Sequence, residues 1–139
     1  MEIADVKRQV LGTIERARRG AAARQVRHDE ASRAYEELLE HVAVPLMRQV
    51  ANVLRTQGFP FTVFTPGGSV RLMSDRSSED YFELLLDATG DDPIVVGHGN
   101  RSRGRRVIES ERPLGPPSTI TEEQLLAFVL HELEPFVER

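Results

Sequence analysis

Apolar side chains recur every three or four positions through the first part of the chain, and this spacing predicts helix over residues 2–57. The region is rich in Ala, Arg, Leu, Glu and Gln, which favour helix. In its first half the stripe has polar interruptions at Lys7, Arg24 and His28. Its apolar members are Ile3, Val10, Ile14, Ala17 and Ala21. A stripe of this kind is typical of a coiled coil or a helical hairpin, and the alternative is an amphipathic helix lying on its own domain.

Three positions bear on whether this region is one helix or two. Gly20 lowers helix stability by about 1 kcal/mol relative to Ala, and Asp29 is a suitable cap for a new helix. A break near residues 20–30 is therefore one of two open alternatives. Pro45 removes a hydrogen bond to the carbonyl of His41, so we expect a kink there. Gly58 has the position of a residue that ends a helix.

The period changes to that of strands between residues 60 and 112. Segments 61–65 and 69–74 alternate on either side of a Pro-Gly-Gly turn and predict a hairpin. A longer strand is expected at 81–88, a short one at 94–97 and another at 105–110, with residues 97–104 as a loop. The short connections favour an antiparallel meander of four or five strands.

The clearest local signal lies near the end of the sequence. Thr121 and Gln124 match a capping box, and Ile120 is placed to contact Leu125 across the first turn. A broad apolar stripe follows, which predicts a helix over 121–138, after a stiff connector at 113–117. We therefore predict an α+β fold with a helical arm at 1–28 and an α+β domain at 29–139. In that domain, helices 30–57 and 121–138 pack on one sheet face.

Composition and charge narrow the classes of protein. The 139 residues are 40% hydrophobic and 29% charged, which is ordinary for a globular chain and unlike a disordered or membrane-spanning one. There is no cysteine, and hence no disulfide, thiol nucleophile or zinc finger. With no apolar leader at the start, we expect a cytoplasmic protein without membrane contact.

Positive charge is concentrated in two places within a chain of net charge −4. Residues 1–28 hold seven Lys or Arg against three acids, and residues 101–112 hold five Arg against two Glu. The Gly-rich segment 97–106 is the best candidate for an anion site, since Arg forks and inward-turned backbone N–H groups suit carboxylate or phosphate. The candidate anion-binding residues are His98, Arg101, Arg103, Arg105 and Arg106. The alternative is a solvated hairpin tip whose charges protect a strand edge.

Signals for catalysis and metal binding are weak. No G-x-S-x-G or H-E-x-x-H motif occurs, and His98 is the one histidine in a Gly-rich segment. Two histidines each share a helix face with two carboxylates: His131 with Glu134 and Glu138, and His41 with Glu37 and Glu40. Such groups usually form a solvated face. We therefore expect no metal and no cofactor, and the sequence leans away from an enzyme.

Two functions remain open at this point. The first is a non-catalytic homodimeric interaction protein, an adaptor or chaperone-like module with an unknown protein partner, paired through the stripe of the arm. The alternative is a binder of anions or of a nucleic-acid backbone that uses the Arg-rich loop 101–106 and the basic arm.

Overall fold

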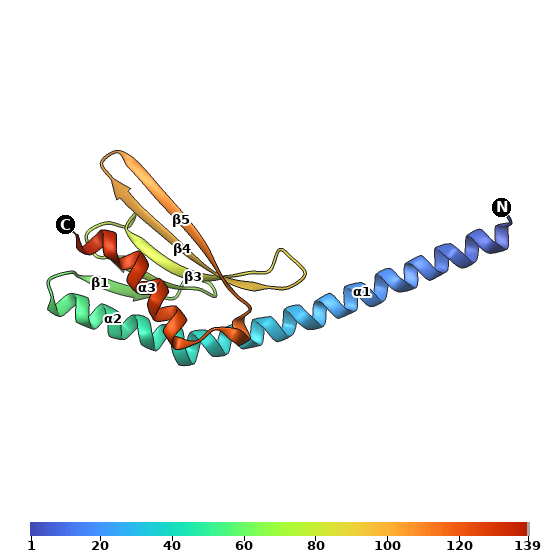
Figure 1. The fold of residues 1–139 in the computed structure, drawn as a ribbon, viewed down its shortest axis with the longest axis horizontal. Helices are drawn as coiled ribbons and strands as arrows, with labels where there is room; N and C mark the ends of the chain where they lie inside the picture. The colour runs from blue at the N-terminus through green and yellow to red at the C-terminus, as the bar shows by residue number, and fades with distance from the viewer. Residues whose placement is uncertain (139) are drawn as a thin grey trace.

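The protein has an α+β fold in which one long helical region precedes a five-stranded antiparallel sheet and a final helix (Figure 1). The computed structural model describes residues 1–138. The helical elements are α1 (Ile3–Leu38), η1 (Leu39–Ala43), α2 (Val44–Thr56), η2 (Pro117–Thr119) and α3 (Glu122–Val137). The strands are β1 (Phe61–Phe64), β2 (Val70–Ser74), β3 (Tyr81–Asp87), β4 (Ile94–Arg103) and β5 (Arg106–Gly115).

The first helix is continuous, so a break near residues 20–30 does not occur. Gly20 lies inside α1 and is followed by three alanines, whose high helix propensity offsets the cost of a single glycine. Asp29 does not cap a new helix. Its carboxylate instead accepts a hydrogen bond from the side chain of Gln25, one turn earlier.

The predicted disturbance at Pro45 is confirmed, and it takes the form of one widened helical turn. In η1 the N–H of Val44 bonds the carbonyl of Leu39, five residues back. Pro45 then occupies the first turn of α2, where its missing N–H is tolerated. A π-turn of this kind is a recognised cause of helix irregularity, and here it joins α1 to α2 without ending the helix.

The end of α2 is a Schellman motif. Gly58 adopts a φ of 87°, and its N–H bonds the carbonyl of Arg55. The N–H of Phe59 bonds the carbonyl of Leu54 at 2.8 Å, and the partly buried Phe59 packs against the core to which Leu54 belongs. The predicted role of Gly58 is therefore confirmed, because a residue without Cβ adopts this backbone conformation without strain.

The strands follow one another in space in the order β1-β2-β3-β4-β5, and every neighbouring pair is antiparallel. The expected loop at 97–104 is wrong, because residues up to Arg103 continue β4 and pair with β5. The glycines at 97 and 99 are in the strand interior because α3 passes close above them. A Cβ at Gly97 would overlap the ring of Phe128, and one at Gly99 would overlap the carboxylate of Glu132.

The last strand is also longer than expected. Strands were expected only as far as residue 112, but β5 runs to Gly115 and includes part of the segment predicted as a connector. Pro113 pairs opposite Val96. A proline is accommodated here because β5 is an edge strand, whose outer N–H groups have no neighbouring strand to bond.

The core lies between one face of the sheet and the helices α2 and α3, as predicted (Figure 1). Phe82 is fully buried at its centre, with its ring 6.2 Å from that of Phe128 and 6.3 Å from that of Phe136. The Thr121–Gln124 capping box is present at the start of α3. It satisfies backbone N–H groups that would otherwise lack partners, and so fixes where α3 begins above the sheet.

Because α3 approaches the sheet over a glycine, we expect Gly97→Ala to destabilise the fold by about 1–3 kcal/mol through overpacking. Gly90→Ala is the matched control, since nothing lies within 4 Å of a Cβ placed there. That control should change the free energy of unfolding by less than about 0.5 kcal/mol. Urea unfolding of the two variants checks this, and equal stabilities would contradict the close packing of α3.

Candidate functional site

The first candidate surface is the part of α1 that extends away from the rest of the molecule (Figure 1). Five large apolar side chains are exposed on it: Ile3 by 87%, Val6 by 44%, Val10 by 51%, Leu11 by 54% and Ile14 by 40%. Ala17 and Ala21 are also exposed. The predicted self-association residues therefore all lie on an uncovered stripe, although their pairing with a second chain stays a prediction.

Val6 and Leu11 belong to this surface but were missed by the sequence analysis. Val6 lies three residues after Ile3 and four before Val10, which is the spacing of one helix face. Leu11 borders the stripe on its other side. The helical period contains this information, since Val6 and Leu11 lie on either side of the strict three–four repeat.

The polar sides of the arm are held by contacts within the helix. Arg8 pairs with Asp5, and Arg19 pairs with Glu15, each one turn apart. Arg16 donates a hydrogen bond to the hydroxyl of Thr13 at 3.1 Å. Such exposed pairs contribute only a few tenths of a kcal/mol each to helix stability.

Three contacts join the base of the arm to the loop between β3 and β4. Nε2 of His28 lies 2.9 Å from the carbonyl oxygen of Gly90. The guanidinium groups of Arg24 and Arg27 lie 3.9 and 3.3 Å from the carboxylates of Asp91 and Asp92. The uncovered part of the arm therefore ends at about residue 24.

One stripe of α1, here called the seam, is exposed on the arm and buried in the domain. Its members alternate at spacings of four and three: Ile3, Lys7, Val10, Ile14, Ala17, Ala21, Arg24, His28, Ala31, Tyr35 and Leu38. Tyr35 and Leu38 are 4% and 6% exposed, and both pack in the core. The sheet domain thus covers the second half of a stripe whose first half has no cover within the described chain.

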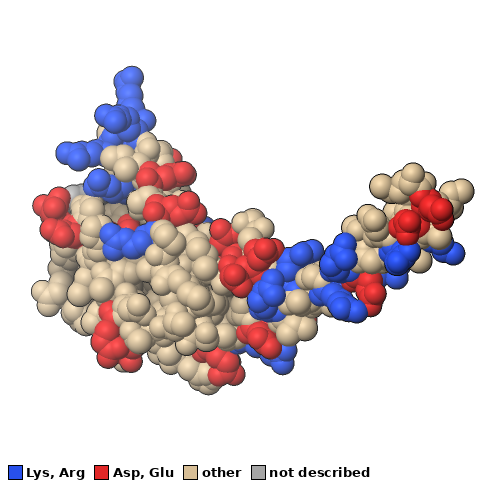
Figure 2. All heavy atoms as spheres, turned by 45° about the vertical axis from the view of Figure 1, so that its right-hand side comes forward, with Lys and Arg blue, Asp and Glu red and all other residues tan. Residues whose placement is uncertain are grey.

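The second candidate surface is the end of the β4–β5 hairpin. β3 pairs with β4 only as far as Asn100, so the hairpin extends past the rest of the sheet. Figure 2 shows basic side chains gathered at its end. Arg101 and Arg103 come from β4, Arg106 from β5 and Arg105 from the turn, where Gly104 has a φ of 64°. None of these four arginines makes an ion pair within residues 1–138.

His98 does not lie with these arginines, contrary to the prediction of a single anion site. It is on a strand rather than in a loop, and residues at odd and even positions of β4 face opposite sides of the sheet. Arg101 lines a hollow beneath α3. His98 instead faces the side of the sheet away from α2 and α3, here called the open face.

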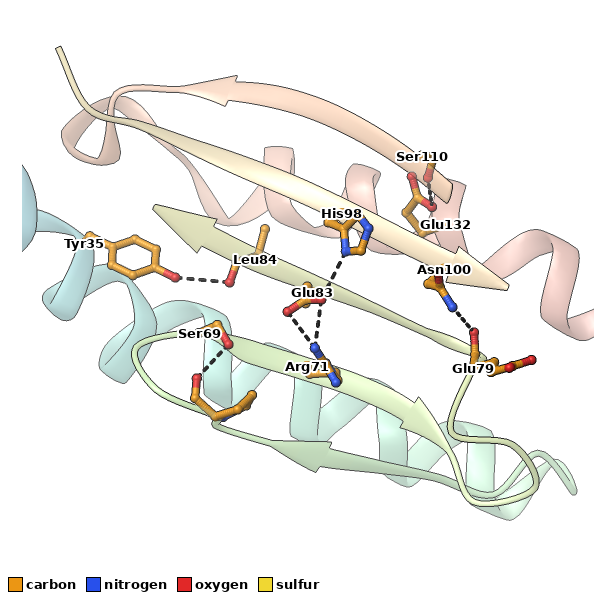
Figure 3. A network of polar contacts seen from close by, with 11 residues as sticks. Tyr35, Ser69, Arg71, Glu79, Glu83, Leu84, His98, Asn100, Ser110 and Glu132 are labelled. Carbon is orange, nitrogen blue, oxygen red and sulfur yellow. Dashed lines mark hydrogen bonds and ion pairs between the residues drawn. The ribbon is translucent and has the colours of Figure 1, made fainter. Parts of the chain in front are cut away.

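On the open face His98 belongs to a polar cluster around Glu83 (Figure 3). The Glu83 side chain is 5% exposed. Its carboxylate accepts hydrogen bonds from Nη2 of Arg71 at 3.1 and 3.2 Å, and lies 3.1 Å from Nδ1 of His98. The Arg71 guanidinium also stacks at 4.0 Å over the ring of Tyr81. The carboxylate is thus tied to the two neighbouring strands, which makes the cluster a structural clamp across β2, β3 and β4.

The hollow beneath α3 has a volume of about 150 Å³ and is lined partly by Ser110, His131 and Glu132. The hydroxyl of Ser110 donates to the carboxylate of Glu132 at 3.2 Å. In a Ser-His-Asp triad the serine hydroxyl is hydrogen-bonded to an imidazole that acts as its base. The serine is bonded here to a carboxylate instead, so this arrangement does not form a catalytic triad.

Within the described residues, no group of three or more His, Asp or Glu side chains is placed to hold a metal ion. None of the helices in this part of the chain has the length and apolar character that crossing a bilayer requires. No family model, curated protein or solved structure matches the chain.

The joint between α1 and the sheet leads to a pH prediction. Burial, with a smaller contribution from the charge of Glu83, raises the pKa of Tyr35 well above its ordinary value of 10.0. The Tyr35 hydroxyl donates to the carbonyl of Leu84 at 3.1 Å. A raised folded-state pKa contributes stability below the unfolded-state pKa, and this contribution is lost as the pH rises above about 10.

We therefore expect Tyr35→Phe to cost about 1–2 kcal/mol at neutral pH, since a buried carbonyl loses its partner. The difference in unfolding free energy from the native protein should shrink above pH ~10. Denaturant unfolding at neutral and high pH checks this. Tyr81→Phe changes the other of the two tyrosines and should keep the alkaline loss. A gap for Tyr35→Phe that grew with pH would contradict the assigned direction.

Proposed function

We propose that this protein is a cytoplasmic, non-catalytic homodimeric interaction protein, an adaptor or chaperone-like module that binds a second protein. The observation that carries the proposal is the arm, whose apolar residues project from the domain with no cover inside the described chain. Large apolar side chains lined up along a projecting helix mark an interaction surface.

Helix energetics support a partner for the arm. The arm continues a helix whose second half is fixed on the sheet, so its nucleus is already formed, but each added residue gains little stability in water. The outer turns of the arm are therefore only marginally stable without a partner. Burying a Val, Leu or Ile side chain contributes about 1.5–3 kcal/mol. Pairing two arms removes several such side chains from water on each chain, and thus stabilises the helix and the dimer together.

The open face of the sheet is the proposed surface for the protein partner. No helix covers it, and Phe64 and Val107 are 42% and 52% exposed at its two edges. In the middle of this face Arg71 neutralises the charge of Glu83, and Nδ1 of His98 lies 3.1 Å from the same carboxylate. A surface that combines neutralised polar groups with exposed apolar side chains suits binding to another protein.

We expect Val10→Gln with Ile14→Gln to weaken self-association at least 10-fold, because both replaced side chains lose apolar burial in each chain. Glutamine retains helix propensity, so the change acts on the surface. Light scattering should give twice the chain mass of 15.6 kDa for the native protein and a single-chain mass for the variant.

Val26→Gln is the matched control. Val26 is 55% exposed but lies about 160° around the helix from Val10, off the seam. It should leave the mass unchanged. The proposal would be overturned if the native protein still had a single-chain mass at a concentration 100-fold above micromolar. Equal masses for the Val10/Ile14 and Val26 variants would overturn it as well.

A second candidate function is supported by the four arginines at the hairpin end. A phosphate backbone binds clustered guanidinium groups, and its affinity falls steeply as salt rises. We expect replacement of Arg101, Arg103, Arg105 and Arg106 by Ser to abolish binding to a mixed pool of RNA and DNA oligonucleotides. Replacement by Lys, which keeps the charge, should retain it. Titrations at several salt concentrations check this, and binding that survives the Ser variant excludes the hairpin as the site.

A further inference from the structure

The geometry points to antiparallel pairing of two arms, in the register that places Ile3 of one chain opposite Ala21 of the other. This inference rests on the proposed self-association, and it specifies the occupant of the seam as the reversed seam of a second copy. Three independent features of the described residues favour it: the charges on the seam, the position of the sheet domain, and the sizes of the seam residues.

Charge disfavours a parallel pair. In a parallel, in-register pair each seam residue lies opposite its own copy. Lys7 would then face Lys7, and Arg24 would face Arg24, inside the contact. No acidic seam residue lies beside the Lys7 pair, since the seam contains no Asp or Glu between Ile3 and Leu38. Arg24 has an acidic neighbour in its own chain, because its guanidinium lies 3.9 Å from Asp91, so the Lys7 pair carries this argument. Like charges brought together and desolvated in this way oppose association.

The sheet domain also obstructs a parallel pair. From His28 onward the seam is covered by the chain's own loop and core, beginning with the contact from His28 to Gly90. The sheet domain therefore lies on the seam side of α1 (Figure 1). In a parallel pair, the two sheet domains would have to occupy the same space between the two helices. In an antiparallel pair the two sheet domains lie at opposite ends of the paired arms.

The antiparallel register places large seam residues opposite small or differently shaped ones. Ile3 meets Ala21, and Val10 meets Ile14. Lys7 meets Ala17, where the lysine's aliphatic stem covers the small side chain while its ammonium group extends to water. Every seam position from Ile3 to Ala21 then has a partner, and no two charges face each other.

The residues beside the seam agree with this register. Val6 of one chain lies beside Gly20 of the other, so that the glycine leaves space for the valine. Near the two-fold axis, Leu11 lies beside the second Leu11, and Thr13 beside the second Thr13. This register therefore also covers the exposed Val6 and Leu11, which a contact between seam residues alone would leave in water.

Neighbouring antiparallel registers are less favourable. A shift that lengthens the overlap by one heptad places Lys7 opposite Arg24 and Ile3 opposite His28, which already contacts Gly90. A shift that shortens it by one heptad pairs Ile3 with Ile14 and leaves Ala17 and Ala21 uncovered. The proposed register is thus the longest one that ends before the seam is covered by its own domain.

Because the chain contains no native cysteine, disulfide trapping gives a direct test. Ile3→Cys and Ala21→Cys are made in separate, differently tagged chains, and both positions are exposed. When the two chains are co-expressed and oxidised, we expect the mixed disulfide dimer. Either variant alone should remain uncrosslinked, since its two cysteines would lie about 27 Å apart, 18 residues at 1.5 Å per residue. A disulfide requires Cα atoms within about 7 Å.

The outcomes separate the orientation from self-association itself. Crosslinking of Ala21→Cys alone, without the mixed species, establishes a parallel pair and overturns the inference while the dimer stands. A dimer by light scattering with neither crosslink overturns the register. A single-chain mass for the native protein means that the proposed function has failed as well. Val26→Cys, off the seam, is the control for random collision and should give no crosslink in any case.

Discussion

The structure depends on one helical stripe that serves two environments. In its second half the seam of α1 buries Tyr35 and Leu38 against the sheet, and the Tyr35 hydroxyl satisfies a carbonyl of β3. In its first half the same stripe has no cover within residues 1–138. The helical period connects the two halves, so that the orientation of the exposed half follows from the packing of the buried half. The contacts that orient α1 on the sheet therefore also orient the arm.

The sheet divides the molecule into two different faces. On one face Gly97 and Gly99 let α3 approach closely, and aromatic rings of Phe82, Phe128 and Phe136 fill the core. On the open face a nearly buried carboxylate, Glu83, is stabilised by Arg71 and His98 from adjacent strands. A charge so far removed from water is tolerated because it is paired and hydrogen-bonded. The polar cluster thus belongs to the architecture of the sheet.

The sequence was sufficient to predict the fold class, the meander, the helix end at Gly58 and the capping box, because each depends on local chemistry. It failed where tertiary contacts reversed a local signal. Gly97 and Gly99 are typical of a loop, but α3 requires them in a strand, and no local pattern contains that information. The same error misplaced His98, whose partner Glu83 lies fifteen residues away on another strand. Gly20 was compatible with a break or a continuous helix, and the surrounding alanines decided the outcome.

The proposed arm pairing and the proposed partner binding would be connected through valency. In the proposed antiparallel dimer the two sheet domains would lie at opposite ends of the paired arms, so the arm contact would leave both open faces and both hairpin ends uncovered. A partner with two binding sites, or two neighbouring partners, would then meet two copies of each surface at a spacing set by a stiff pair of helices. A second contact on the same assembly occurs at raised effective concentration, and its avidity is lost when the geometry forbids both contacts at once. Under this proposal, residues of the arm that touch no partner would still affect how tightly a partner is held, because they would determine whether two surfaces act together.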